Sequence, residues 1–164
     1  MLSALVTSLK INRFKRCIDR FFDTPASDWD VLAAERGFAL ELGDYSVSGI
    51  IDAVARRENG DLVVLDYKAT QTERSLDENL QLPLYLIAIN EMLEEDVSHA
   101  GYVYVGETGP KVELRSFSHD ELGDLRTMLV DHVREIEEST YGDYTPGEHC
   151  EWCPHRSLPC SDKT

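Results

Sequence analysis

The stretch from Gly49 to Lys68 constrains the fold of this chain more than any other part of its sequence. It predicts two strands, Ser46–Arg57 and Asp61–Lys68, joined at Asn59-Gly60, a dipeptide typical of tight hairpin turns. β-Branched residues lie in the middle of the first strand, and the second runs apolar through Leu-Val-Val-Leu. The sequence therefore predicts a hairpin around which the remaining elements are arranged.

Charged side chains interrupt the apolar pattern of this hairpin. Asp52 lies in the first strand, and Asp66 and Lys68 end the second. An unpaired charge in a buried strand costs several kcal/mol, which is comparable to the stability of a whole protein. Strand pairing would bring these groups together, either as an ordinary salt bridge at a strand end or as a site for a divalent metal ion with a lysine beside it.

The metal alternative has a definite chemistry. Asp52 and Asp66 would bind Mg²⁺ or Mn²⁺ and leave positions open for water and phosphate oxygens, and the backbone carbonyl of Tyr67 would add a ligand. A metal lowers the pKa of a bound water and neutralises the charge of a phosphorane-like transition state. Lys68 alternates with Asp66 along the strand, so it would point to the same face and position the attacking hydroxide.

The charge balance of the chain is strongly acidic. Its 164 residues, long enough for one domain with a real core, include 31 acidic and 16 basic side chains, a net charge of −15. An acidic surface of this kind is typical of adaptation to high salt and by itself argues against binding of nucleic acid. A local basic cluster near the N-terminus weakens the argument against nucleic-acid binding and supplies candidate DNA-binding residues. Its members are Lys10, Arg13, Lys15, Arg16 and Arg20.

We expect a cytoplasmic protein that does not enter membranes. The longest apolar run, near Leu82–Ile89, is too short to span a bilayer. Basic residues follow the apolar N-terminal stretch instead of preceding it, which argues against a secretory signal.

Periodicity and turn signals predict a single α/β domain, 1–164, with a core over about residues 30–140. Ala33–Leu42 fits either a strand or a few helical turns, whereas a helix over Asp77–Leu93 would have Asp77 as its N-cap. Leu122, Leu125, Leu129, Val133 and Ile136 would form the buried stripe of the last helix. The other predicted elements are helices over Val6–Phe22 and Ser118–Glu138, strands over Gly101–Val105 and Val112–Phe117, and a Cys-rich tail over Gly142–Cys160 without periodicity.

Residues outside the hairpin strengthen the metal interpretation. Glu35 would supply an upstream carboxylate, Gly49 leaves room for backbone or substrate, and Gln81 and Tyr85 share a helix face at i, i+4 spacing. Each has a simpler explanation as a solvated or packed side chain.

Together these residues resemble the RecB-like branch of the PD-(D/E)XK nuclease superfamily. The matching motifs, in the family's order, are Glu35, G-x-x-D at Gly49–Asp52, D-Y-K at Asp66–Lys68 and Q-x-x-x-Y at Gln81–Tyr85. The resemblance implies a mixed sheet flanked by helices and metal-dependent cleavage of DNA phosphodiesters, with the aspartates as metal ligands and the lysine as catalytic partner. Gln81 and Tyr85 would orient the substrate or the active site. No histidine precedes Glu35, so a ligand found in some members is missing or replaced.

The cysteines predict a second metal centre. Cys150, Cys153 and Cys160 lie in the tail, and Cys17 lies alone in the first helix. Zinc, a disulfide or scattered structural thiols are alternatives. One remote cysteine and a C-terminal trio resemble the iron–sulfur staple of AddB-type helicase–nucleases and CRISPR-associated RecB-like exonucleases. The resemblance implies a [4Fe–4S] cluster that ties the two ends of the domain together.

The resulting hypothesis is a Mg²⁺- or Mn²⁺-dependent DNA nuclease, with an exonuclease of repair or recombination as the expected type. The sequence contains no G-x-x-x-x-G-K-[ST] motif, so no P-loop motor is encoded here. Besides DNA, the resemblance to helicase–nucleases implies a helicase subunit or domain as partner, and the chain would be a stand-alone nuclease, a separately encoded subunit or a fragment of a larger helicase–nuclease. The alternative is a non-catalytic DNA-binding or scaffold module stabilised by the cluster. A weaker third interpretation is a redox or zinc protein in which the strand charges are incidental.

Overall fold

The computed structural model describes residues 2–69, 75–76, 80–93, 96–107, 109–139 and 147–154, with the side chains of 2–9 and 148–149 left out of the description. The chain divides into two compact units, Met1–Val130 and Asp131–Thr164. Its elements are α1 (Leu2–Phe22), η1 (Pro25–Asp28), β1 (Asp30–Leu42), β2 (Tyr45–Arg56), β3 (Leu62–Lys68), α2 (Gln81–Met92), β4 (His99–Tyr104), β5 (Lys111–Ser116), α3 (His119–Glu138) and η2 (Glu148–Trp152).

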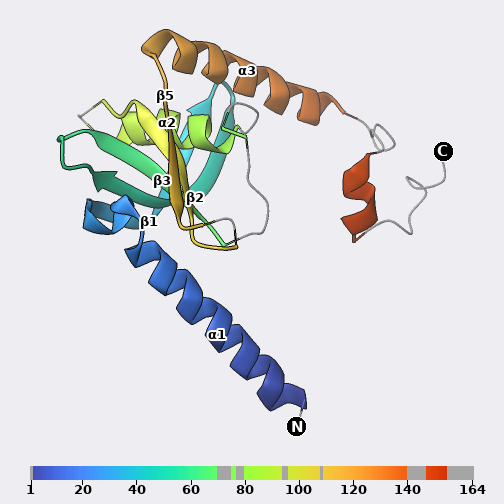
Figure 1. Cartoon of the computed structure of the whole chain (residues 1–164). Helices are drawn as coiled ribbons and strands as arrows, with labels where there is room; N and C mark the ends of the chain where they lie inside the picture. Colours follow the sequence, from blue (N-terminus) through green and yellow to red (C-terminus); the bar gives the residue numbers. More distant parts are fainter. Residues whose placement is uncertain are drawn as a thin grey trace. The chain divides into compact units, whose positions relative to one another are not determined.

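The strands form one five-stranded sheet in the order β1-β2-β3-β4-β5 (Figure 1). Neighbouring strands are antiparallel except β3 and β4, which run parallel and are joined through α2. A parallel pair needs such a crossover, whereas antiparallel neighbours need only short turns. The mixed sheet with its helices confirms the predicted α/β class.

The hairpin between β2 and β3 forms as its sequence predicts. Gly60 adopts a φ of 93°, in the left-handed region that glycine tolerates best, and the Asn59 side chain bonds Asp61 across the turn. A second glycine turn, with Gly43 at a φ of 65°, joins β1 to β2. Residues 33–42, which fitted either strand or helix, belong to β1.

Helix α2 begins later than the sequence predicts. Its first helical residue is Gln81 and Leu80 occupies the N-cap position, whereas Asp77 lies outside the described residues. This start places Pro83 in the first helical turn, where its missing N–H costs nothing. A helix beginning near residue 77 would have placed the same proline inside the hydrogen-bonded part of the helix.

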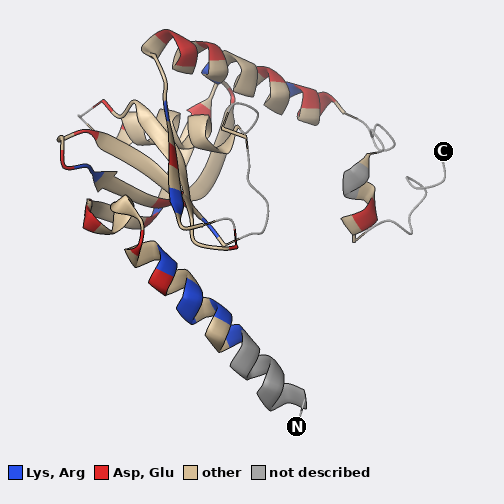
Figure 2. Cartoon of the chain, in the orientation of Figure 1, with Lys and Arg blue, Asp and Glu red and all other residues tan. Residues whose placement is uncertain are grey.

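Helices α1 and α3 differ in charge. Lys and Arg side chains gather along the described part of α1, whereas Asp and Glu dominate α3 (Figure 2). At the start of α3, the Glu121 N–H donates to Ser118 Oγ at 3.1 Å, an N-cap bond. Of the predicted buried stripe of α3, Leu129 is buried, Leu122, Leu125 and Val133 are half-buried, and Ile136 is 73% exposed. Ile136 lies in the second compact unit, so the long stripe was wrong at this end.

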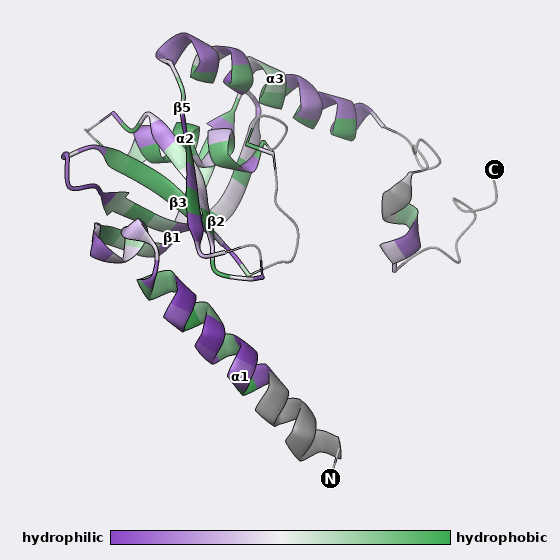
Figure 3. Cartoon of the chain, viewed as in Figure 1, coloured by the Kyte–Doolittle hydropathy of each residue, from purple (hydrophilic) through white to green (hydrophobic). Residues whose placement is uncertain are grey.

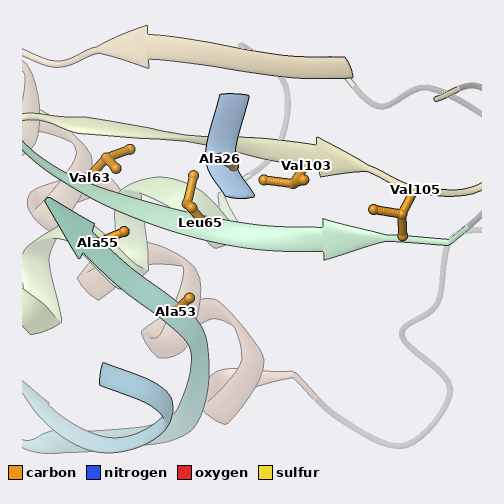
Figure 4. Close-up of a cluster of buried hydrophobic side chains, with 7 residues drawn as sticks. All are labelled: Ala26, Ala53, Ala55, Val63, Leu65, Val103 and Val105. Carbon is orange, nitrogen blue, oxygen red and sulfur yellow. The ribbon is translucent and has the colours of Figure 1, made fainter. Parts of the chain in front are cut away.

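The sheet is hydrophobic along its central strands (Figure 3). One face holds a buried cluster of small and branched side chains from η1, β2, β3 and the region of β4 (Figure 4). Its members are Ala26, Ala53, Ala55, Val63, Leu65, Val103 and Val105. Cys17 and Phe21 of α1 pack against this cluster. Full burial of one valine or leucine contributes about 1.5–3 kcal/mol, so the cluster fixes the position of β3 firmly.

Among the residues that the structure describes, no helix combines the length and the apolar character needed to cross a membrane.

Candidate active site

Asp52 and Asp66 lie on facing strands at the point where the β2–β3 ladder ends. The last pair of that ladder is Ala53 with Leu65, so one further step in the same register sets Asp52 against Asp66. Residues directly opposite each other in an antiparallel pair point to the same face. The structure therefore brings the two predicted carboxylates together on one face of the sheet.

Beyond this pair, the Asp52 side chain accepts a hydrogen bond that a backbone carbonyl of β2 would accept in a regular ladder. Its Oδ2 accepts the backbone N–H of Tyr67 at 2.9 Å. Because the N–H and C=O of one strand residue point to the same side, the Tyr67 carbonyl also points toward the β2 side of β3. The Lys68 carbonyl points the other way, where the N–H groups of Val105 and Gly106 donate to it.

Asp66 and Lys68 form a buried ion pair. Asp66 is 2% exposed, and Lys68 Nζ contacts its Oδ2. The same Nζ lies 3.4 Å from Gln81 Oε1 and 5.3 Å from the centroid of the Tyr102 ring. The ammonium group is thus surrounded by a carboxylate, an amide oxygen and an aromatic face, all of which attract a cation.

Gln81 and Tyr85 meet on the first turns of α2. Gln81 Nε2 donates to Tyr85 Oη at 2.8 Å, and the Gln81 carbonyl oxygen faces Lys68, so a continuous polar network links α2 to β3. The Phe38 ring packs edge-on against Tyr85 with a centroid distance of 5.8 Å. The predicted helix face therefore reaches the ion pair.

Gly49 has a packing role that the sequence did not suggest. A Cβ at this position would lie 2.8 Å from Phe38 Cε1 and 2.9 Å from Cζ. The space that its missing side chain leaves is occupied by the Phe38 ring, which in turn supports Tyr85. The expected room for backbone or substrate is thus taken by an aromatic side chain.

Glu35 lies beside this region in an irregular part of β1. The register pairs Ala34 with Ala53 and Arg36 with Ile51, so Glu35 is at the level of Asp52 across the strand pair. Its φ of 49° is left-handed, which is unusual for a residue other than glycine, and its side chain is exposed. The backbone there departs from the regular strand next to Asp52.

The side chains around Asp52 and Asp66 offer ligands suited to Mg²⁺ or Mn²⁺. The described residues contain no group of three or more His, Cys, Asp or Glu side chains placed to hold a metal ion. Magnesium needs fewer, because it keeps several waters and is commonly bound by one or two carboxylates with substrate phosphate. Two carboxylates and the Tyr67 carbonyl fit that pattern.

Tyr67 points to the opposite face from Asp66 and Lys68. Burial, with a further contribution from the Asp52 carboxylate, raises the pKa of its phenol above the ordinary value of 10.0. Its ring packs edge-on against Phe21 of α1, with a centroid distance of 5.8 Å. The strand residue that bonds Asp52 through its backbone is thus held in place by its side chain.

The basic cluster of α1 divides into two groups. Arg13, Arg16 and Arg20 line a cavity of about 200 Å³ together with Cys17, Gly106 and Glu107, whereas Lys10 and Lys15 are exposed outside it. Arg13 Nη2 donates to the Ala69 carbonyl at 2.9 Å, and Arg20 donates to the Gly106 carbonyl. Arg13 therefore reaches the residue directly after Lys68, and Arg20 reaches the segment that follows β4.

No disulfide joins the cysteines in the described part of the chain. Cys17 is half-buried on α1, and Cys150 and Cys153 lie in and after η2. The Gly147 N–H donates to Cys150 Sγ with an N–S distance of 3.4 Å. Cys160 lies outside the described residues.

Two residues near the ion pair were missed from the sequence. Tyr102 lies under Lys68, and Phe38 supports Tyr85. The alternation of tyrosine with valine in its strand indicates that Tyr102 shares a face with Tyr104, but its contact with Lys68 depends on the parallel register that pairs it with Asp66. Phe38 had no comparable signal, since its contact depends on the β1 register.

Comparison with known proteins identifies the class of protein that this fold and site define. The model of the PD-(D/E)XK nuclease superfamily matches residues 7–158. The chain belongs to this superfamily.

Particular relatives are similar over part of the chain. An ATP-dependent helicase/deoxyribonuclease subunit of Streptococcus uberis (strain ATCC BAA-854 / 0140J) is 30% identical over 102 residues, 57% of this chain and 9% of that protein. The protein of the same name from Streptococcus pyogenes serotype M49 (strain NZ131) is 29% identical over 94 residues, 53% of this chain and again 9% of that protein. The chain thus spans a small part of the length of these relatives.

A solved structure shares the fold. The crystal structure of SSO0001 superposes with a TM-score of 0.54 at 17% identity and covers 80% of this chain and 62% of that chain. At this identity the likeness concerns the fold alone.

Proposed function

We propose that this chain is a Mg²⁺- or Mn²⁺-dependent deoxyribonuclease that hydrolyses phosphodiester bonds. The observation that carries the proposal is the meeting of Asp52, Asp66 and Lys68 at the end of the β2–β3 ladder, where Asp52 bonds the Tyr67 backbone and Lys68 contacts Asp66. Superfamily membership supports the reaction class, and the relatives' name, helicase/deoxyribonuclease, supports DNA as substrate.

In this proposal the aspartates and the Tyr67 carbonyl would hold the metal. The metal supplies Lewis-acid stabilisation of the phosphoryl oxygens and a nucleophilic water at neutral pH. Lys68 donates a hydrogen bond to the attacking water or to a phosphate oxygen, because its Nζ lies on the same face as both carboxylates.

The surrounding residues have positioning roles in this mechanism. Gln81 fixes the Lys68 ammonium, Tyr85 fixes Gln81, and both belong to α2, so the helix sets the direction from which the ammonium approaches. Glu35 lies at the level of Asp52 on an exposed, irregular part of β1 and would supply a further carboxylate near the metal site.

Substrate preference and biological role are the finer parts of the proposal. We place the activity in DNA repair or recombination, as an exonuclease that works with a helicase subunit or domain, because the relatives carry the name helicase/deoxyribonuclease. The basic residues of α1, which reach the end of β3 through Arg13, would contact the DNA backbone.

The test is cleavage of DNA labelled at either end, single- or double-stranded, with Mg²⁺, Mn²⁺ or EDTA. We expect metal-dependent shortening from one end, loss of cleavage in Lys68→Ala, and full cleavage in the matched variant Lys111→Ala on β5. DNA binding without cleavage by the wild-type protein would instead identify a non-catalytic DNA-binding module.

We also propose a [4Fe–4S] cluster on Cys17, Cys150, Cys153 and Cys160. The resemblance to the AddB-type staple carries this proposal, and two observations support it. Cys17 lines the arginine-rich cavity of α1, whose guanidinium groups suit an anionic cluster, and Cys150 receives an N–H···S contact.

Iron and sulfide analysis after anaerobic purification tests the cluster. We expect about four irons per chain, lost in Cys17→Ser and retained in the matched surface variant Ser46→Ala. Stoichiometric zinc without iron would contradict the cluster and leave the nuclease proposal standing.

A further inference from the structure

A second concave surface lies away from the proposed catalytic residues. It encloses about 750 Å³, a volume typical of ligand sites, between η1, the β2–β3 turn and β5. Asp28 and Trp29 line it from the η1 side, Arg57 and Glu58 from the turn, and Val112 and Leu114 from β5. None of Asp52, Asp66, Lys68, Gln81 or Tyr85 lines it.

The floor of this cavity is apolar and continuous with the core. Trp29, Val112 and Leu114 are only half-buried, and all pack against the buried cluster of Figure 4. An apolar side chain placed in the cavity would extend that core, because it would cover these residues from the solvent side.

The cavity adjoins an open sheet edge. β5 is the outermost strand and pairs with β4 alone among the described strands. On its other face, Lys111 contacts Glu113 and the Tyr104 ring, and Arg115 contacts Glu121. Those charged side chains are engaged, whereas Val112 and Leu114 face the cavity. An extended peptide that pairs with such an edge places alternate side chains on the face of the neighbouring pocket.

The rim of the cavity is acidic. Asp28 and Glu58 are exposed carboxylates. Arg57, the cation among the described residues of the lining, lies 5.7 Å from the centroid of the Trp29 ring and pairs with Asp61 at 3.7 Å, so its charge is already balanced. The local field therefore attracts basic groups and repels phosphates.

We propose that this cavity and the edge of β5 bind an extended segment of a partner protein. The segment adds a strand to β5, inserts an aliphatic or aromatic side chain over Trp29, and carries Lys or Arg residues that face Asp28 and Glu58. This proposal is independent of the nuclease activity, because it uses none of the proposed catalytic residues.

A fluorescently labelled peptide of sequence Lys-Leu-Lys-Leu-Lys-Leu-Lys tests the proposal by anisotropy in about 0.15 M NaCl. Two control peptides replace every leucine by serine or every lysine by glutamate. We expect both controls to bind at least about tenfold more weakly. Equal binding of the serine peptide would overturn the proposal, because it would show attraction to the acidic surface in general.

Variants locate the binding. Asp28→Asn with Glu58→Gln should weaken binding of the lysine–leucine peptide by about threefold or more. Val112→Thr should also weaken binding, because it places a hydroxyl group in the apolar floor of the cavity. The matched pair Asp44→Asn with Asp124→Asn removes the same charge from exposed positions elsewhere and should leave binding unchanged. Equal effects of the two pairs would contradict the assigned site.

A spectroscopic readout completes the test. In a Trp152→Phe background, Trp29 is the remaining tryptophan, so a blue shift of its emission on peptide addition reports cover over the cavity. Binding without any change at Trp29, or displacement of the peptide by single-stranded DNA, would contradict the proposal.

Discussion

At the scale of single residues, the Asp66–Lys68 pair is costly, because both charged groups are largely removed from water. Asp66 is 2% exposed, and its carboxylate depends on the neighbouring ammonium for charge balance. Removal of one partner from a buried pair leaves an uncompensated charge, whereas removal of both does not. The proposed metal and phosphate chemistry would account for a buried pair that contributes little to stability by itself.

The first prediction concerns this pair. In EDTA, Lys68→Met should lower the free energy of unfolding by about 3 kcal/mol, because Asp66 is then buried without its cation. The double variant Asp66→Asn/Lys68→Met should recover most of that loss. Urea unfolding measures both, and a Lys68→Met protein as stable as the wild type would show that the pair is solvated in solution.

The second prediction concerns Tyr67. Its pKa is raised by burial and by Asp52, so the unfolded chain loses the phenol proton at a lower pH than the folded chain. This contribution to stability is complete below about pH 10 and is lost as the pH rises toward the folded pKa. Between about pH 9 and about pH 11, Tyr67→Phe should lose less stability than the wild type. An identical alkaline decline in both proteins would refute this.

At the scale of elements, the β4–β5 pairing depends on a close backbone approach. A Cβ on Gly101 would overlap the Glu113 carbonyl oxygen of β5, a clash that no side-chain movement relieves. Gly123 on α3 has nothing within 4 Å of the same position. The two glycines therefore occupy opposite environments.

This contrast gives the third prediction. Gly101→Ala should destabilise the protein by about 3 kcal/mol or more, because β5 must move away from β4. Gly123→Ala should stabilise it by up to about 1 kcal/mol through helix propensity. Thermal unfolding of both variants measures the difference, and a neutral Gly101→Ala would mean that the strands are spaced more widely than the structure shows.

Much of the element order follows from local sequence. Alternation, the Asn59-Gly60 turn and helical periodicity predict the order of strands and helices and place Asp66 and Lys68 on one face. The start of α2 was misplaced because Pro83 fits a first turn better than a second. The exposed end of α3 was missed because periodicity indicates which residues share a face but not whether anything packs there.

The candidate site is less accessible to sequence reasoning than the fold. Asp52 was identified by its type and position, but its bond to the Tyr67 N–H depends on where the ladder ends. Likewise, the roles of Phe38 and Tyr102 arise from long-range packing. Such contacts join residues that are far apart in the chain, so the local sequence pattern around either residue does not predict them.

At the scale of the whole molecule, the acidic charge dominates. A net charge of −15 on 164 residues implies repulsion within the folded chain, relieved locally where basic side chains gather on α1 (Figure 2) or form ion pairs, as Lys111 does with Glu113 and Arg115 with Glu121. Salt at high concentration screens that repulsion over distances longer than about 3 Å at 1 M. The molecule therefore has a physical reason to be more stable in concentrated salt.

The fourth prediction follows from this charge. The Tm should rise as NaCl increases from about 0.05 M to about 1 M, mainly at the low end, where the Debye length changes most. KCl should act equally, because the effect is screening and not specific binding. A Tm that falls with either salt would show that attractive pairs outweigh the net repulsion.

In the proposed function, Asp52, Asp66 and Lys68 form a metal-dependent phosphodiesterase centre. Its most direct test is the initial rate of cleavage of end-labelled DNA as a function of Mg²⁺ concentration, for the wild type, Asp66→Asn and the surface control Asp44→Asn. We predict metal-dependent cleavage that falls by about a thousandfold in Asp66→Asn and is unchanged in Asp44→Asn. Cleavage by Asp66→Asn at the wild-type rate would contradict the claim.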